Sequence, residues 1–172
     1  MARVSTRENK NIYQLTRENL QLTRETASEL LESIPPERIE KIENERSFPH
    51  PDEVLTMAEK YKKPDLCNYY CANQCPIGQE YVPEIKIKDL SQIVLEMLAS
   101  LNAMNKRKDR LIEITADGKI SDDELEDFLY IQEELERISI TVETLQLWAE
   151  KMLATGVIDE ARYEAYRSRK KT

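Results

Sequence analysis

The chain has 172 residues, of which 34% are charged and 40% hydrophobic, a composition typical of a soluble helical protein rather than a disordered one. Only three residues are glycine, too few for the tight turns of an all-β sandwich or for a glycine-rich nucleotide-binding fold. The apolar runs are too short for a membrane-spanning helix and the N-terminus carries no secretory signal, so we expect a cytoplasmic protein.

The 25 basic and 33 acidic residues give a net charge of −8. Positions 1–64 hold 11 basic and 12 acidic residues, whereas 14 and 21 follow, so most of the negative charge belongs to the second part of the chain. Proteins that bind nucleic acid derive most of their affinity from neutralising phosphates. A DNA-binding surface on this chain must therefore be local, and only a motif can reveal it.

Prolines and cap residues predict five short helices before residue 75. Four are expected at residues 11–22, 24–32, 35–44 and 51–62, and the fifth begins at Pro64. Thr23 is expected to cap the second helix, and Ile39 and Ile42 are expected to face inward from the third. The sequence from Cys75 to Gly78 predicts a break, which a polar linker follows. We therefore predict a first domain at residues 1–75, a linker at 76–84 and a second domain at 85–172.

The second domain is predicted to be a long helical hairpin with a short C-terminal helix, because apolar residues recur at helical spacing. The stripe on the first long helix comprises Ile87, Leu90, Val94, Met97, Leu101, Met104 and Leu111. The stripe on the second comprises Leu125, Phe128, Leu135, Ile138, Val142, Leu145, Ala149 and Met152. The predicted fold class is thus all-α, a five-helix domain followed by this hairpin and a short terminal helix.

Both long helices carry apolar residues outside these stripes, namely Ile93, Leu98, Ile112, Ile131, Ile140, Leu147 and Trp148. Two helices alone leave part of such wide apolar arcs in water. We therefore expect a homodimer in which a second hairpin completes a four-helix bundle around a two-fold axis, with Leu147 pointing outward. The alternative is that the Cys-bearing fifth helix and the terminal helix with Tyr163 and Tyr166 cover this surface within one chain.

The stretch at residues 12–62 carries a motif. Its strongest part is Arg38-Ile39-Glu40-Lys41-Ile42-Glu43-Asn44, followed by Arg46, Pro49 and a leucine-bearing helix. The segments Leu22-Thr23-Arg24-Glu25 and Glu29-Leu30-Leu31 precede it. Over about residues 8–75 the chain resembles the Cro-type, or xenobiotic-response-element, family of bacterial helix-turn-helix transcriptional regulators.

This resemblance implies a sequence-specific regulator of transcription that binds double-stranded DNA. Residues 24–32 would cross the DNA backbone, and residues 35–43 would form the recognition helix in the major groove. Thr23 and Arg24 would contact phosphates at a helix N-terminus. The side chains that would face base edges and flanking phosphates are Glu37, Arg38 and Lys41.

Asn44 and Arg46 would contact the DNA backbone just after the recognition helix. Glu37 and Glu40 lie in the same helix, and carboxylates repel phosphates even though they accept from cytosine N4. The alternative function is therefore an acidic adaptor whose first domain docks a protein. A contiguous acidic face on this helix would favour the adaptor.

Cys67, Cys71 and Cys75 have the spacing C-x3-C-x3-C. They are interpreted as small packing residues, as ligands of zinc or an iron–sulfur cluster, or as redox-sensing thiols. A straight helix separates the first and last by about 12 Å, too far for one ion, so metal binding requires a break near Cys75. Packing is the preferred interpretation, and we assign no metal or cofactor.

Enzyme motifs do not occur in the sequence: there is no P-loop, nucleophile elbow or zinc-protease motif. His50 is the only histidine, which leaves little for general acid–base catalysis. We therefore expect no enzymatic activity.

Overall fold

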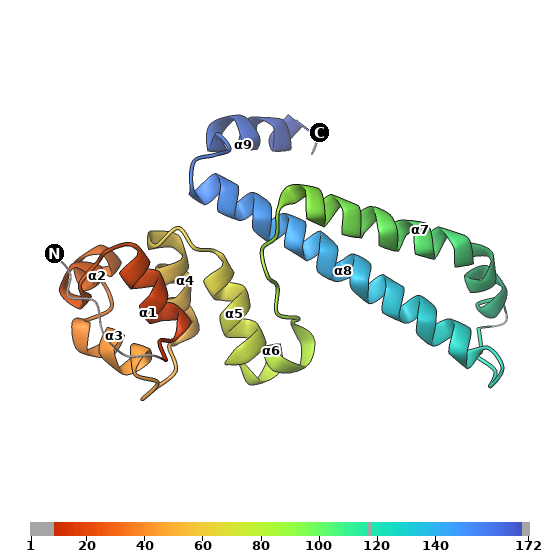
Figure 1. Ribbon diagram of the computed structural model, residues 1–172, viewed down its shortest axis with the longest axis horizontal. Coiled ribbons are helices and arrows are strands. Elements are labelled where there is room, and N and C mark those ends of the chain that lie inside the picture. Colours follow the sequence, from red (N-terminus) through yellow and green to blue (C-terminus); the bar gives the residue numbers. More distant parts are fainter. Residues whose placement is uncertain (1–8, 117, 170–172) are drawn as a thin grey trace. The chain divides into compact units, whose positions relative to one another are not determined.

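The computed structural model describes residues 9–116 and 118–169, a part of the chain that consists of helices and their connections (Figure 1). The helices are α1 (Ile12–Asn19), α2 (Arg24–Leu31), α3 (Pro36–Glu43), α4 (Pro51–Lys60), α5 (Asp65–Asn73), α6 (Pro76–Tyr81), α7 (Leu90–Ile114), α8 (Leu125–Ala154) and α9 (Glu160–Arg169). The all-α fold class is therefore confirmed, with the long pair α7 and α8 and the short terminal helix. The first eight residues of the predicted first domain lie outside the described residues. None of the described helices is long and apolar enough to cross a membrane.

The chain divides into two compact units. The first unit extends to Glu84 and includes the residues from Ala149 onward, whereas the second comprises Ile85–Trp148. Helices α1–α6 therefore belong to the first unit, and α7 with most of α8 forms the second.

The core of the first unit is built from α1–α5. Ile39 and Ile42 of α3 are buried among side chains of the other four helices, as predicted. The buried cluster comprises Tyr13, Ala27, Leu31, Ile34, Ile39, Ile42, Val54, Met57, Ala58, Tyr61 and Leu66. Burial of this apolar surface holds α3 against its neighbours. The opposite side of α3, with Glu37 and Lys41, remains exposed.

The first four helices end in a shared way. Within two positions of each helix end lies a residue with φ between 55° and 60°, namely Gln21, Glu32, Glu45 and Lys62. After α3 the N–H of Glu45 donates to the carbonyl of Ile42, and the N–H of Arg46 donates to the carbonyl of Lys41. These two bonds are the Schellman cap, in which the left-handed residue is usually glycine. At these four helix ends, residues other than glycine therefore adopt the left-handed backbone conformation.

The segment predicted as a break and a polar linker contains α6, which begins at Pro76. A proline disrupts the interior of a helix but fits its first turn. Pro76 therefore separates α6 from α5 and is the first residue of α6. The side chain of Gln79 donates to the carbonyl of Asn73 at 2.8 Å and ties α6 back to α5. Gly78 is the point of closest approach, because a Cβ there would lie 2.1 Å from the carbonyl oxygen of Cys71.

In the second unit, α7 and α8 run antiparallel and side by side (Figure 1). Asp127 near the start of α8 accepts from Arg107 Nη1 at 2.7 Å and from Arg110 Nε at 2.8 Å, which ties the C-terminal half of α7 to α8. Ile93, Ile114 and Ile131 are the most deeply buried apolar side chains of this unit.

The two apolar stripes, interpreted from their spacing as core-facing or coiled-coil faces, are only partly buried within the hairpin. Exposed members of the stripes are Leu90, Val94, Leu101, Leu125, Leu135 and Val142. Ile93 and Ile131, which were assigned outside the stripes, are buried, and Leu147, predicted to point outward, is only 7% exposed. Apolar residues cover a wide arc on each helix, so periodicity does not reveal which edge of the arc meets the partner helix.

Gly78→Ala is expected to lower the free energy of unfolding by about 1 to 3 kcal/mol, because the new methyl group collides with rigid backbone of α5. Urea unfolding followed by circular dichroism measures this change. The matched control is Glu80→Ala, on the exposed side of the same helix, which should stay within about 0.5 kcal/mol of the native value. Equal stability of both variants would contradict the close packing of α6 on α5.

Candidate nucleic-acid interface

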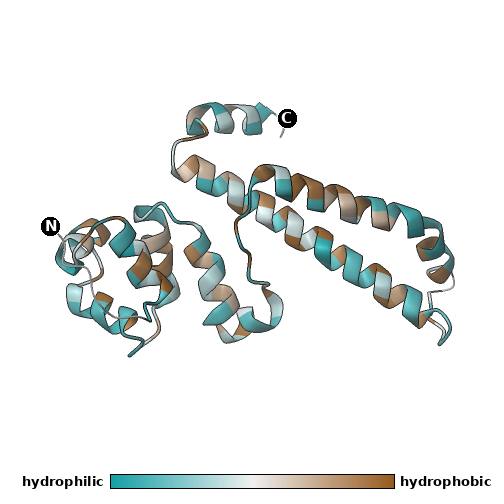
Figure 2. Ribbon diagram, in the orientation of Figure 1, coloured by the Kyte–Doolittle hydropathy of each residue, from teal (hydrophilic) through white to brown (hydrophobic). Residues whose placement is uncertain are grey.

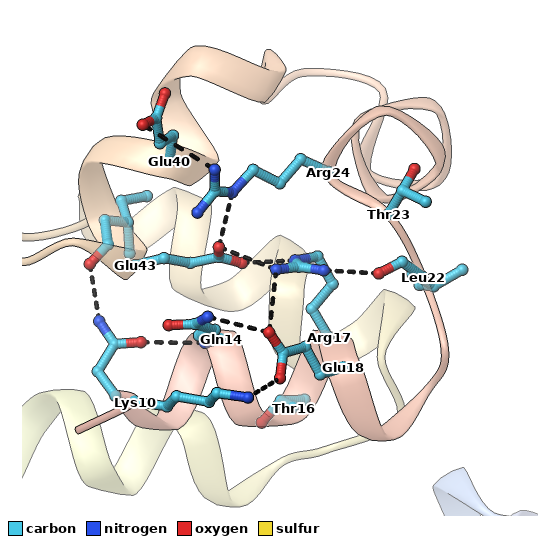
Figure 3. Close-up of polar contacts among 12 residues, drawn as sticks. Lys10, Gln14, Thr16, Arg17, Glu18, Leu22, Thr23, Arg24, Glu40 and Glu43 are labelled. Carbon is cyan, nitrogen blue, oxygen red and sulfur yellow. Dashed lines mark hydrogen bonds and ion pairs between the residues drawn. The ribbon is translucent and has the colours of Figure 1, made fainter. Parts of the chain in front are cut away.

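A buried carboxylate lies where α1, α2 and α3 meet (Figure 3). Glu43, the last residue of α3, is 1% exposed. It accepts from Arg17 of α1 through Nε at 2.5 Å and Nη2 at 3.0 Å, and from Arg24 Nε of α2 at 2.8 Å. Arg17 also donates through Nη1 to the carbonyl of Leu22 at 2.6 Å. One carboxylate therefore ties three helices together at the end of the predicted recognition helix.

Two guanidinium groups compensate for the burial of Glu43. An unpaired charge in this position would be costly, whereas charge-assisted, bidentate hydrogen bonds offset the loss of water. Burial disfavours the charged form of Arg17, but the hydrogen bonds and charge of Glu43 outweigh it and raise the pKa of Arg17. Arg17 therefore stays charged, and the geometry of its hydrogen bonds to Glu43 restrains the angle between α1 and α3.

Thr23 and Arg24, the predicted phosphate contacts, lie at the start of α2. Thr23 is the N-cap residue: its hydroxyl accepts from the N–H of Thr26 at 3.2 Å, and its own N–H donates to the Thr26 hydroxyl at 2.9 Å. The Arg24 side chain is 31% exposed while Glu43 holds its Nε. Thr23 is thus engaged in capping α2, and Arg24 in holding α2 to α3.

Arg38, predicted to face base edges, is held inside the first unit. Its Nε and Nη2 donate to the two carboxylate oxygens of Glu53 at 2.7 and 2.6 Å. Its Nη1 donates to the Ser47 hydroxyl at 2.7 Å, and Nη2 also donates to the carbonyl of Phe48 at 2.9 Å. The guanidinium therefore fastens the connection between α3 and α4.

The remaining predicted residues lie on or just beyond the outer side of α3. Glu37 and Lys41 are exposed one helical turn apart, and Arg46 is exposed three residues after the helix ends. Asn44 is the C-cap residue of α3, and its side-chain amide donates to Glu40 Oε1 at 3.3 Å. The structure thus brings Glu37, Lys41 and Arg46 to the outer surface, whereas the Arg38 side chain is bound to the α3–α4 connection and to Glu53 of α4.

The surface formed by α2, α3 and their connections has an acidic excess. Its exposed glutamates are Glu25, Glu29, Glu32, Glu37 and Glu45, and its exposed basic residues are Lys41 and Arg46. Arg24 and Arg38 do not balance these glutamates, because other carboxylates already pair with them. Lys60 of α4 pairs with Glu32 at 3.2 Å, which leaves four exposed glutamates on this surface without an ion pair among the described residues. Phosphates would therefore meet positive charge only locally, around Lys41 and Arg46.

Sequence reasoning assigned no role to Arg17, Glu43 or Glu53. Arg17 follows Tyr13 by one helical turn on the buried side of α1, and Glu43 follows the buried Ile42. Charged residues are almost never fully buried unless they are paired, so a charge on a predicted core face indicates a buried partner. That signal was available for Glu43, one helical turn after Ile39, and for Arg17, one turn after Tyr13. Glu53 gave none, because it is only partly buried and lies in the first turn of α4, where acidic residues are common.

The three cysteines lie on two helical segments. Cys67 and Cys71 belong to α5, and Cys75 is the N-cap residue of α6, so the helix does break where a metal site would require it. All three thiols are free and half-buried, and no group of three potential metal ligands gathers within the described residues. Burial, with a contribution from Cys71, raises the pKa of the Cys67 thiol. The assignment of no metal or cofactor stays a prediction.

No protein-family model, no curated protein and no solved structure matches this chain.

The Arg38–Glu53 pair makes stability depend on pH. Burial opposes ionisation of Glu53, but hydrogen bonds from Arg38 and from the His50 N–H outweigh it and lower its pKa. A carboxyl with a lowered folded pKa stabilises the protein above its unfolded pKa, about 4.3, and loses that contribution as pH falls through the folded pKa. We therefore expect Glu53→Gln to cost about 1 to 2 kcal/mol at pH 7 and progressively less as pH falls below about 4.

Urea unfolding of both proteins at pH 7, 4 and 3 measures this difference. Glu59→Gln, an exposed position on the same helix, is the matched control and should stay within about 0.5 kcal/mol of the native value at pH 7. A Glu53→Gln deficit that is constant from pH 7 to pH 3 would rule out the ion pair as its source.

Proposed function

We propose that the first unit binds double-stranded DNA with α3 in the major groove, and that the protein regulates transcription as a homodimer. The observation that supports this proposal most is the fixed position of α3 within the first unit. Ile39 and Ile42 are in the core, Glu43 is bound to α1 and α2, and the side with Glu37 and Lys41 is open to solvent. Direct readout needs a helix whose exposed donors and acceptors are rigidly placed. The resemblance of residues 8–75 to the Cro-type family supports the same assignment.

In this proposal Lys41 and Glu37 face the base edges. A lysine donates to guanine O6 and N7, and a glutamate accepts from cytosine N4, so together they favour a G·C-containing site. Arg46, just beyond α3, contacts a phosphate of the same groove. Thr23 and Arg24 approach a second phosphate at the N-terminus of α2, where backbone N–H groups and the helix dipole favour anions.

Arg38 has a positioning role in this proposal rather than the base-reading role expected from sequence. Reading a guanine would require its guanidinium to leave Glu53, Ser47 and the Phe48 carbonyl together. Held as it is, Arg38 keeps the α3–α4 connection, and with it Arg46, in place. Asn44 caps α3, and its side-chain amide donates to Glu40 within that helix.

A second candidate function is docking of a basic protein, and the acidic excess of the α2–α3 surface favours it. Five exposed glutamates, of which Glu32 is paired with Lys60, share this surface with two exposed cations, a balance that repels phosphate and attracts basic side chains. If DNA is the partner, non-specific binding must be weak. With two or three phosphate contacts per unit, the slope of log K against log salt should be only about −2 to −3 per unit.

Selection of bound sequences from random duplex DNA at two salt concentrations tests the proposal. Enrichment of one motif, ordered as two related half-sites, is the expected result. If no duplex is retained even at low salt, DNA binding is wrong. Retention of the protein by a basic polypeptide in the same conditions would then support the adaptor.

Three variants separate the contacts on the selected duplex. Arg46→Ala should weaken binding to all duplexes alike and reduce the salt slope by about 1, since it removes a phosphate contact. Lys41→Ala should relax the preference at one base pair by about 1 to 3 kcal/mol. Lys106→Ala, an exposed lysine of α7, is the control that should leave both quantities unchanged. Fluorescence anisotropy titrations at several salt concentrations measure both. A uniform effect of all three variants would contradict the assigned contacts.

A further inference from the structure

We propose that one face of the α7–α8 hairpin is the dimer interface, and that the same face of a second copy of this chain covers it. The inference rests on the homodimer of the proposed function and names its surface. It does not depend on whether α3 binds DNA.

Helix α7 presents an apolar stripe to solvent. Leu90, Val94, Leu98 and Leu101 follow one another at spacings of four, four and three residues, which places them on a single side of the helix. Their side chains are between 40% and 51% exposed, and Ile112, three turns beyond Leu101, continues the stripe. Figure 2 shows how densely hydrophobic residues recur along α7.

Helix α8 carries a matching stripe. Phe128, Leu135 and Val142 are seven residues apart, the spacing of seams in helical bundles and coiled coils. Leu135 and Val142 are exposed although neither is near a helix end. Each long helix therefore buries one part of its apolar arc within the unit and leaves the other part open.

The two stripes lie on the same face of the hairpin. Val94 directly follows the buried Ile93, Leu135 follows the buried Glu134, and Val142 follows the buried Thr141. Each step of one residue along an α-helix turns the side-chain direction by about 100°, always in the same sense. The buried sides of the two antiparallel helices face each other. Seen from one end of the hairpin, this step of about 100° runs anticlockwise on one helix and clockwise on the other. Both exposed stripes therefore point toward the same side of the hairpin.

Charged groups that are already paired mark another side of the hairpin. Asp127 holds Arg107 and Arg110, and the Arg107 guanidinium stacks 4.2 Å from the ring centroid of Tyr130. Arg137 donates to Glu134 at 2.7 Å. These groups are satisfied within one chain, whereas the apolar stripes are not.

A second copy fits this face in size and in period. The 25 residues of α7 extend over about 37 Å, and two helices side by side are about 20 Å wide, so the face measures about 700 Å². That is close to the roughly 800 Å² that each partner contributes to a standard stable interface. An identical hairpin supplies stripes of equal length and spacing, and four helices close a bundle.

The stripe on α7 is interrupted between Leu101 and Ile112 by Asn105 and Lys108. A polar side chain within a helical seam lowers stability but specifies the register and number of helices. These two residues are therefore expected to restrict the pairing to one alignment of the two copies.

The test is the mass of the full chain in solution, measured by sedimentation equilibrium from 1 to 50 µM. The native protein should have twice the mass of one chain. Leu98→Glu, on the proposed face, should raise the dimer dissociation constant by about a hundredfold or more, because it places a charge in an apolar seam. Leu129→Glu is the matched control: Leu129 is 49% exposed, against 51% for Leu98, but lies a third of a turn from the α8 stripe.

The proposal is supported if Leu98→Glu sediments as a monomer with native helical content while Leu129→Glu remains a dimer. Leu135→Lys provides a second disruption from α8 if Leu98→Glu does not fold. A native monomer at 50 µM, or dimers that persist in both face variants, would overturn the proposal. Loss of DNA binding by a variant that is still dimeric would bear on the proposed function alone.

Discussion

The first unit depends on one buried carboxylate. Glu43 at the end of α3 is buried from solvent. Arg17 and Arg24 supply the hydrogen bonds and opposite charge that offset the cost of burying its carboxylate. The three residues come from three helices, so their mutual geometry restrains how α3 is presented. The apolar core supplies the driving force for packing, but a core alone tolerates small rotations of a helix, whereas a three-way ion pair does not. The orientation of α3 is thus determined by charge as well as by packing.

This use of charge limits what the surface can do. Arg24 and Arg38 are two of the four basic residues expected at DNA, and carboxylates of the unit already bind both. The outer surface is left with Lys41 and Arg46 among glutamates. Such a surface suits selective recognition of a few groups better than strong non-specific attraction. The proposed homodimer would compensate for weak single contacts, because two linked units would bind one duplex with a higher effective concentration.

Much of the fold was predictable because it depends on local chemistry. Prolines marked the starts of α3 and α4, Thr23 marked α2, and the spacing of Ile39 and Ile42 gave the buried side of α3. Three features were not predictable locally. The left-handed residues that end α1 to α4 are not glycine. Helix α6 begins at Pro76, a residue that also indicates a break, and the buried edge of the α7 arc is set by α8. The role of Arg38 was missed for a similar reason, because Glu53 reaches it only after α4 has packed.

A double-mutant cycle on the Arg17–Glu43 pair tests the central claim most directly. Urea unfolding of Arg17→Met, Glu43→Leu and the double variant, followed by circular dichroism, gives the coupling free energy of the two side chains. Each single variant leaves a buried charge short of its partner and should lose about 3 to 5 kcal/mol. The double variant should lose less than the sum, with a coupling of at least about 2 kcal/mol. Additive losses, with a coupling below about 0.5 kcal/mol, would contradict the claim that this pair holds α3 in place.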